Sequence, residues 1–237
     1  MIVARGVARP KSGTVAPRGL VVPAYFHPAV AGADWRVLAG AGRSVRAVIL
    51  NAADGPGASP ELELTAAAVA TRRPIYGYVD THYGRRPLDE VHRDVERWRR
   101  WYPAAGIFLD RVATGVHSLP WYERLVSFVR RRGPGIVVLN HGVYPHPGYA
   151  VVADAMVTFE GPYAAHREVD VPEWARALPA DRFWHLVYDT PHRLMNETLD
   201  RAAATNAGAV FVTDRAGRNP WDGLPGYFAA EASAWAG

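Results

Sequence analysis

Two carboxylic acids follow short apolar segments, in positions from which a pair of acids could cleave a glycosidic bond. Asp110 follows residues 106–109, and Glu160 follows residues 155–159. Buried parallel strands of α/β folds commonly present catalytic groups at their carboxyl ends. An acid and a carboxylate that face one cleft are the minimum for glycoside hydrolysis. The alternative for each acid is a structural one, as a cap on the segment that follows.

The same ending recurs along the whole chain, which favours an ordered set of strands. Six further apolar segments, residues 20–26, 45–50, 74–79, 136–139, 183–188 and 209–213, each run directly into a polar residue. These polar residues are His27, Asn51, Asp80, Asn140, Asp189 and Asp214. Eight such segments, apolar on both faces, are typical of a buried parallel sheet. Their spacing is close to one βα unit, so the sequence predicts an α/β fold, a single (β/α)8 TIM barrel over residues 20–237, after a flexible segment of residues 1–19.

Helices are expected between these strands. Residues 89–98 and 121–129 repeat apolar side chains at helical spacing, and further helices are expected from Pro60 onward and over residues 192–204. After Asp214 the sequence shows only turn signals and a short aromatic tail, so no helix is predicted there.

Composition and charge limit the possible functions. The chain of 237 residues is 49% hydrophobic, enough for one full core, and it lacks cysteine, which excludes disulfides and thiolate chemistry. No apolar run is long enough to span a membrane. The first 19 residues lack the apolar region of a secretory signal, so the compartment stays open between the cytosol and export of a chain whose leader was removed. The net charge of +4 comes largely from arginines at expected helix ends, so no nucleic-acid partner is predicted.

A metal centre and a serine nucleophile are less well supported than an acid pair. Potential metal ligands at strand ends and in nearby loops are Asp80, His82, Asp110, His141, His146 and Glu160. No His-x-His or His-Glu-x-x-His spacing concentrates them, and no Gly-x-Ser-x-Gly segment occurs. We therefore expect neither a metal nor a cofactor.

Several motifs together raise a family resemblance. In order, they are VPAYF at residues 22–26, NAADGPG at 51–57, GYVDTHYGRR at 77–86, GIFLD at 106–110, ADAMVTFE at 153–160 and VTD at 212–214. From Val22 to Trp221 the chain resembles the spherulin 4 (spherulation-specific family 4) proteins, which include fungal and bacterial glycoside hydrolases. The resemblance implies a (β/α)8 barrel and endo-cleavage of α-1,4-linked N-acetylgalactosamine, as in galactosaminogalactan. An amino-sugar polysaccharide or oligosaccharide is thus the expected partner.

One residue departs from that family. Fungal members carry an Asp-Glu pair where this chain has Asp110 and Arg111. Arg111 is expected either to point away from the site or to lower the pKa of Asp110 by proximity. The departure also leaves open a barrel that binds glycans without cutting them, with Arg111 as the mark of lost activity.

The two acids receive different expected roles. Asp110 is the predicted nucleophile or charge stabiliser, and Glu160 the general acid and base, because its aromatic surroundings favour a raised pKa. A retaining mechanism is expected. Candidate sugar platforms are Tyr25, Tyr78, Tyr83, Tyr163 and Trp221, because pyranose faces stack on aromatic rings. Candidate hydrogen-bonding residues for substrate are His27, Asn51, Asp80, His82, Asn140, Asp189 and Asp214.

Overall fold

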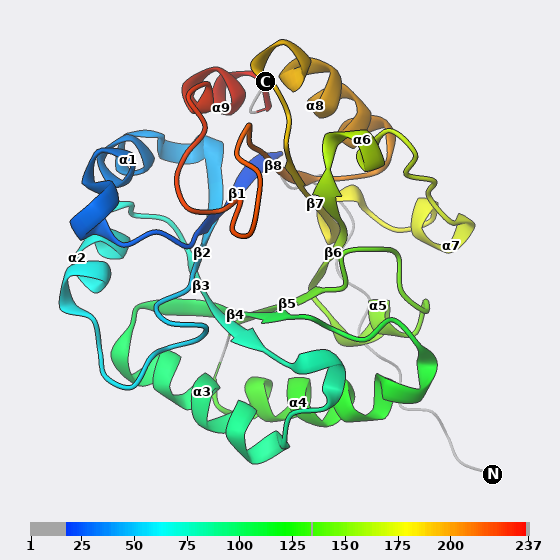
Figure 1. Ribbon diagram of the computed structural model, residues 1–237. Helices are drawn as coiled ribbons and strands as arrows, with labels where there is room; N and C mark the ends of the chain where they lie inside the picture. Colours follow the sequence, from blue (N-terminus) through cyan, green and yellow to red (C-terminus); the bar gives the residue numbers. More distant parts are fainter. Residues whose placement is uncertain (1–17, 134, 236–237) are drawn as a thin grey trace.

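Eight parallel strands form a closed barrel in the computed structural model, which describes residues 18–133 and 135–235 (Figure 1). Each strand pairs with the next in sequence, and the last pairs with the first. The strands are β1 (Gly19–Ala24), β2 (Val45–Leu50), β3 (Ile75–Asp80), β4 (Ala104–Asp110), β5 (Ile136–Asn140), β6 (Ala155–Pro162), β7 (Phe183–Tyr188) and β8 (Ala209–Val212). The predicted (β/α)8 barrel is confirmed. Residues 1–17 of the expected flexible segment lie outside the described residues, and the division at residue 19 stays a prediction.

Helices surround the barrel (Figure 1). They are α1 (Pro28–Gly40), α2 (Leu62–Ala70), α3 (Leu88–Trp101), α4 (Leu119–Arg131), α5 (Tyr149–Val152), α6 (Tyr163–His166), α7 (Glu173–Arg176), α8 (Met195–Ala204) and α9 (Phe228–Trp235). The four helices expected from the sequence correspond to α2, α3, α4 and α8. No helix among the described residues is both long and apolar enough to cross a membrane.

Helix α3 shows how sequence pattern sets the packing. Val91, Val95 and Trp98 share one face and are fully buried against the barrel. The indole Nε1 of Trp98 donates to the carbonyl oxygen of Tyr78 at 2.7 Å. The ring lies over Gly77 of β3, where an added Cβ would be 2.4 Å from the indole carbons. Gly77 therefore lets α3 approach the strand that carries part of the site.

Helix α9 corrects the expectation of a structureless tail after Asp214. Phe228, Ala232 and Trp235 are buried at helical spacing, and so is Glu231. The carboxylate oxygen Oε1 of Glu231 accepts a hydrogen bond from the backbone N–H of Val212 at 2.7 Å. Strands β8 and β1 pair at only two positions, which do not include Val212. The carboxylate of Glu231 therefore provides an acceptor for the backbone N–H at the carboxyl end of β8. Helix α9 therefore helps to close the barrel.

The carboxyl ends of the strands meet at one rim of the barrel. Asp80 and Asp110 are directly paired at the ends of β3 and β4. The loop after β8 returns over this rim, where the backbone N–H of Tyr25 donates to the carbonyl oxygen of Trp221 at 3.2 Å. Residues far apart in the sequence are thereby brought to one side of the barrel.

Candidate active site

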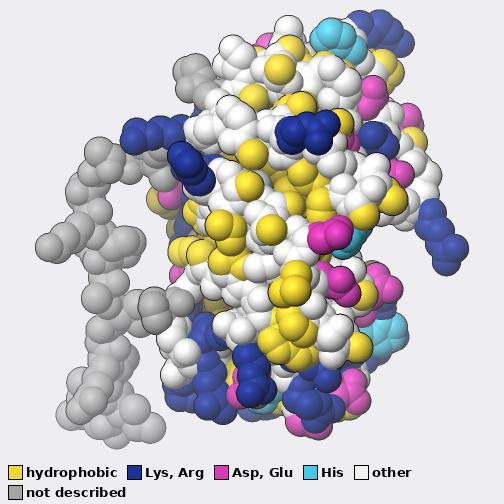
Figure 2. Space-filling model, turned by 90° about the vertical axis from the view of Figure 1, so that its left-hand side faces the viewer, with side chains coloured by type: hydrophobic (Ala, Val, Ile, Leu, Met, Phe, Trp, Pro, Cys, Tyr) yellow, Lys and Arg dark blue, Asp and Glu magenta, His cyan; other side chains and the backbone are white. Residues whose placement is uncertain are grey.

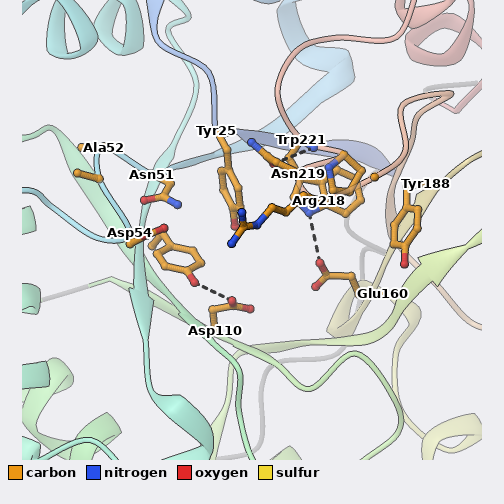
Figure 3. A pocket seen from close by; sticks show the side chains of 14 residues that line it. Tyr25, Asn51, Ala52, Asp54, Asp110, Glu160, Tyr188, Arg218, Asn219 and Trp221 are labelled. Carbon is orange, nitrogen blue, oxygen red and sulfur yellow. Dashed lines mark hydrogen bonds between the residues drawn. The ribbon is translucent and has the colours of Figure 1, made fainter.

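A cleft lies at the carboxyl ends of the strands, with Asp110 and Glu160 in its wall (Figure 3). Its larger arm has a volume of about 780 Å³, and a smaller arm of about 270 Å³ lies on the other side of the acids. Asp110, Glu160 and Tyr188 line both arms. The two acids therefore stand where the arms meet, so a chain molecule lying in the cleft would pass over them.

The side-chain amide of Asn140 joins the two acids. Its Nδ2 donates to Oδ1 of Asp110 at 2.6 Å and to Oε2 of Glu160 at 2.5 Å. Its oxygen accepts from the backbone N–H of Gly142 at 3.1 Å, which orients the amide. The two carboxylate oxygens on Nδ2 can therefore lie no more than about 5 Å apart, the sum of the two hydrogen-bond lengths.

The remaining carboxylate oxygens also have donors. The hydroxyl of Tyr78 donates to Oδ2 of Asp110 at 2.8 Å, and the indole Nε1 of Trp221 donates to Oε1 of Glu160 at 3.3 Å (Figure 3). Asp110 thus has the shorter of these two bonds, and the backbone N–H of Arg111 also stabilises its charge. The ionised form is therefore better supported at Asp110 than at Glu160.

Burial raises the pKa of both acids. The pKa of Asp110 is raised by burial, against which Tyr78, the backbone of Arg111 and Asn140 act. The pKa of Glu160 rises to about 7, first through burial and then through the negative charge of Asp110. The hydrogen-bond donors around Asp110 favour its carboxylate form, whereas Glu160, with a pKa of about 7, can hold a proton near neutral pH. The pair can therefore act as a carboxylate and a proton donor.

We expect Glu160→Gln to stabilise the protein more at pH 8 than at pH 5. The pKa of Glu160 is raised from 4.5 to about 7, so its favourable contribution is complete below pH 4.5 and is lost as the pH rises through 7. Glutamine avoids that loss, and the gain is at most a few kcal/mol at about 1.4 kcal/mol per pKa unit. Urea unfolding at both pH values measures it.

The control for this experiment is Glu168→Gln, at an exposed residue outside the cleft, which should shift the free energy of unfolding equally at both pH values. An equal shift for Glu160→Gln would show that its carboxyl group titrates as an exposed one does.

Arg111 lines the smaller arm, and its guanidinium turns toward β3 and the loop after it. Nε lies 3.4 Å from Oδ1 of Asp80, Nη2 contacts Nδ1 of His82, and the guanidinium lies over the ring of Tyr83 at 5.4 Å. Burial raises the pKa of Asp110 overall, and the backbone N–H of Arg111 acts against that rise together with Tyr78 and Asn140. The expectation that Arg111 points away from the site is wrong, because Arg111 lines the smaller arm.

The structure gathers six of the predicted substrate-binding residues in the cleft. Tyr25, Asn51, Tyr78 and Trp221 line the larger arm, and Tyr83 and Asn140 line the smaller one. The rings of Tyr25 and Tyr78 meet edge to face at 5.5 Å. Three of the six, Tyr78, Asn140 and Trp221, donate hydrogen bonds to the acids.

The other six predicted residues line neither arm. Nδ1 of His27 accepts from the N–H of Ala29 at the start of α1, and the hydroxyl of Tyr163 donates to Glu197 at 2.7 Å. Asp189 and Asp214 are exposed beyond the ends of their strands. Asp80 and His82 contact the guanidinium of Arg111 instead of lining the cleft. Their roles in substrate binding stay predictions that this arrangement does not favour.

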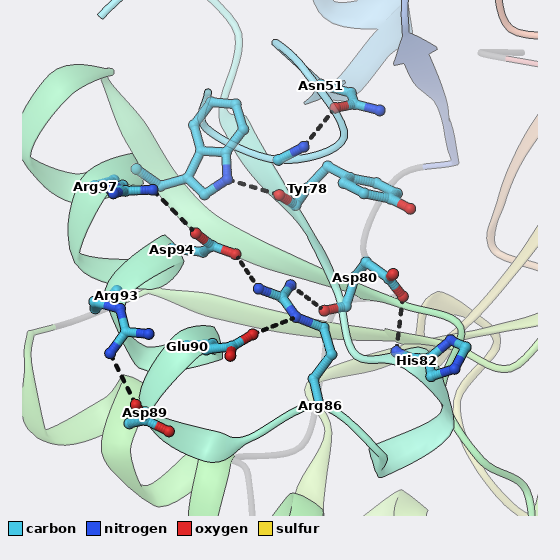
Figure 4. A network of polar contacts seen from close by, with 12 residues as sticks. Asn51, Tyr78, Asp80, His82, Arg86, Asp89, Glu90, Arg93, Asp94 and Arg97 are labelled. Carbon is cyan, nitrogen blue, oxygen red and sulfur yellow. Dashed lines mark hydrogen bonds and ion pairs between the residues drawn. The ribbon is translucent and has the colours of Figure 1, made fainter. Parts of the chain in front are cut away.

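Asp80 also belongs to a charge network that fixes β3 to α3 (Figure 4). Its carbonyl oxygen accepts from Arg86 at 2.7 Å, and Arg86 in turn donates to Asp94 of α3 at 2.8 Å. The backbone N–H of His82 donates to Oδ1 of Asp80 at 2.7 Å. The network therefore holds the end of β3 and the following turn in one arrangement beside the cleft.

Several lining residues were not predicted from the sequence. They are Asp54, Tyr188, Arg218 and Asn219 in the larger arm, and His141 and Gly142 in the smaller arm. Tyr188 is the last residue of β7, one position before the predicted Asp189, which turns away with a φ of +53°. An aromatic residue at the end of an apolar segment is the sequence signal that could have identified Tyr188. Among the described residues, no group of three or more His, Asp or Glu side chains is arranged to hold a metal ion.

Comparison with known proteins places these features in a family and a fold. The family described as Spherulin4, spherulation-specific family 4, matches residues 19–235. Spherulin-4 of Physarum polycephalum is 29% identical, over 92% of this chain and 70% of its own. Sph3 of Aspergillus clavatus, crystallised in complex with GalNAc, is 24% identical with a TM-score of 0.78, over 95% of this chain and 100% of its own. The α-L-fucosidase isoenzyme 2 of Paenibacillus thiaminolyticus has a TM-score of 0.60 at 15% identity, over 92% of this chain and 48% of its own.

Proposed function

The chain belongs to spherulation-specific family 4, and from that premise we propose that it is a glycoside hydrolase that cuts α-1,4-linked N-acetylgalactosamine chains, as in galactosaminogalactan, at internal positions. The observation that carries the proposal is the pair of buried acids, Asp110 and Glu160, joined by one amide nitrogen inside an open cleft. The choice of amino sugar is supported by Sph3, which shares this fold and was crystallised with GalNAc.

The separation of the acids supports a retaining mechanism. Retaining pairs stand about 5 to 5.5 Å apart, whereas inverting pairs need about 6.5 to 9.5 Å to admit a water molecule. The oxygens of Asp110 and Glu160 that share Nδ2 of Asn140 lie no more than about 5 Å apart, which is below the inverting range. Room for a water molecule between them is therefore lacking, which favours direct attack by one acid.

In the first step Asp110 attacks the anomeric carbon while Glu160 gives its proton to the glycosidic oxygen. The bond to the leaving sugar breaks, and the other sugar is left covalently attached to Asp110. In the second step Glu160 takes a proton from water, the hydroxide oxygen attacks the anomeric carbon, and Asp110 leaves as a carboxylate. Tyr78 and Asn140 keep Asp110 ionised as the nucleophile, and burial keeps Glu160 protonated as the acid.

The shape of the cleft supports cleavage within a chain. Both arms are open and meet at the acids, so sugar units can occupy either side of the bond that breaks. Tyr25 offers aromatic surface in the larger arm and Tyr83 in the smaller one, whereas Trp221 is 4% exposed and bonds to Glu160 through its Nε1. An enzyme that removed only terminal units would need one arm closed.

The test is mass spectrometry of α-1,4-linked N-acetylgalactosamine oligosaccharides incubated with the protein. We expect shorter oligosaccharides with new reducing ends to accumulate over time. A barrel that only binds glycans would retard the polymer in an affinity gel and release no new ends. That result would favour the binding alternative, and no effect in either assay would point to another polymer.

We expect Tyr78→Phe to shift the acidic limb of the pH–rate profile to higher pH and to lower kcat roughly tenfold or more. The variant removes a donor to Asp110, so the pKa of that acid rises further and less of it is ionised at a given pH. The matched control is Tyr163→Phe, whose hydroxyl bonds to Glu197 outside both arms. A profile for Tyr78→Phe that coincides with the control would remove Tyr78 from the mechanism.

A further inference from the structure

The turn that carries Arg111 is held in an uncommon backbone conformation. Arg111, His82 and Tyr83 have φ angles of +50°, +46° and +58°, in the left-handed region that costs non-glycine residues roughly 1 kcal/mol or more each. The guanidinium of Arg111 contacts the side chains of His82 and Tyr83, and Arg111 and Tyr83 line the smaller arm of the cleft. Strain of this kind persists only where surrounding contacts enforce it, and it gathers at functional sites.

Contacts from the loop after β3 enforce this conformation. The N–H of Tyr83 donates to the carbonyl oxygen of Arg111 at 2.6 Å, and the hydroxyl of Thr81 donates to the same oxygen at 2.9 Å. Asp80 and His82 then fix the guanidinium through Nε and Nη2. The backbone and the side chain of Arg111 are thus both positioned from the loop after β3.

One edge of the guanidinium is left for a ligand. Arginine has five N–H donors, and those on Nη1 have no partner within the described part of the chain. Asp80 offsets the positive charge, so the free edge suits a neutral acceptor oxygen better than a sulfate or carboxylate. A sugar carrying a free ammonium group would meet a cation and offer no acceptor oxygen there.

We propose that Arg111 determines substrate specificity by donating to the acetamido carbonyl oxygen of the sugar unit in the smaller arm, which selects N-acetylated over deacetylated galactosamine at that position. This inference rests on the proposed function. It also gives Arg111 a role in an active cleft, in place of a mark of lost activity. The ring of Tyr83 lies under the guanidinium and lines the same arm, so it helps to hold Arg111 in place.

The experiment compares fully acetylated and deacetylated α-1,4-galactosamine oligosaccharides of equal length, by calorimetric binding and by kcat/KM. The wild type should prefer the acetylated form at least about tenfold, a contact of roughly 1.4 kcal/mol or more. Arg111→Ala should bring the ratio close to one, and Arg111→Lys, which keeps a cation, should retain part of it. Arg93→Ala on the exposed surface of α3 is the control and should keep the wild-type ratio.

Binding separates the two ideas. If the acetylated oligosaccharide binds and is never cut, the proposed hydrolysis is overturned. The ratio of the two binding affinities, compared between the wild type and Arg111→Ala, still tests the specificity role of Arg111. If Arg111→Ala, folded by circular dichroism, lowers affinity for both oligosaccharides equally, the specificity role is overturned. A wild type that prefers the deacetylated form, or binds neither, overturns it as well.

A separate observation concerns the outer face of α1 and α2. Val30 and Val37 on α1 are 85% and 49% exposed, and Leu62 and Val69 on α2 are 78% and 57% exposed. Leu62 and Val69 are seven residues apart in a regular helix and share its outer face, whereas α1 is kinked at Ala31, so Val30 and Val37 are exposed on either side of that kink. Figure 2 shows hydrophobic side chains gathered over the middle of this side of the molecule, with charged ones crowded toward its lower edge.

We infer that this face, Val30 and Val37 of α1 with Leu62 and Val69 of α2, binds a second copy of the chain. Arg36 on α1 and Glu63 on α2 are exposed residues of opposite charge on the same two helices. Neither forms an ion pair within the described residues. A two-fold axis that packs α1 of each copy on α2 of the other would join Arg36 to Glu63 twice. The face is therefore complementary to itself in both apolar surface and charge.

Sedimentation velocity over a range of micromolar concentrations tests this interface. The wild type should form a dimer, and Val37→Glu and Val69→Glu should be monomeric. The control Val151→Glu, at a 75% exposed valine on α5, should remain dimeric. Arg36→Glu should weaken the dimer and Arg36→Glu with Glu63→Arg should restore it. A monomeric wild type, or a dimer that ignores both apolar variants, would overturn the inference.

Discussion

Asp110→Asn and Glu160→Gln should each lower the turnover of α-1,4-linked N-acetylgalactosamine oligosaccharides by at least about a thousandfold while the protein remains folded. Each change removes one half of the acid pair and keeps the size of the side chain. Initial rates of reducing-end release measure the loss. Full activity in either variant would contradict the assignment of that residue.

Two further measurements separate the roles of the acids. A substrate with a leaving group that needs no proton, such as a fluoride, should form the covalent intermediate in Glu160→Gln but not in Asp110→Asn. Added azide should rescue Asp110→Ala by attacking the anomeric carbon from the side that the carboxylate leaves empty, giving a glycosyl azide of inverted configuration. Glu197→Gln, outside both arms, is the control and should keep the wild-type rate.

Gly77→Ala should destabilise the protein by about 3 kcal/mol or more. The new Cβ would lie 2.4 Å from the indole carbons of Trp98, so α3 must move and the bond from Trp98 to the carbonyl oxygen of Tyr78 must stretch. Urea unfolding gives the change in the free energy of unfolding.

Gly40→Ala at the end of α1 is the matched control, because nothing lies within 4 Å of its added Cβ. This change should be neutral or slightly stabilising. If Gly77→Ala unfolds at the same urea concentration as Gly40→Ala, the close approach of α3 to β3 is wrong. A partial recovery in Gly77→Ala with Trp98→Leu would show that the indole ring is the obstacle.

The strands were predictable because a strand that is buried on both faces is a continuous apolar run. The polar residue that follows each run lies at the rim of the barrel. Helix α9 was missed for the opposite reason. Its sequence, FAAEASAW, is apolar almost all round and lacks the polar face that separates a helix from a tail. Its only acid, Glu231, is buried against the N–H of Val212.

At the site, the strand ends indicated which residues reach the rim but not how they pair. That Asn140 would join both acids depends on the tilt of three strands, and Trp221 reaches Glu160 from 61 residues away in sequence. The direction of Arg111 depends on a positive φ that residue type does not predict for arginine. The sequence therefore predicted the strands and helices, but it did not predict how side chains from different elements are arranged relative to one another.

The amide of Asn140 also has a pharmacological consequence. It is a neutral donor placed between two acids, and in the proposed mechanism positive charge develops on the sugar beside those acids. An iminosugar with a protonated ring nitrogen would bring a full charge to that point and favour the ionised form of Glu160. Because the pKa of Glu160 is about 7, binding would expel its proton, and inhibition would strengthen as the pH rises through neutrality until the inhibitor loses its own proton.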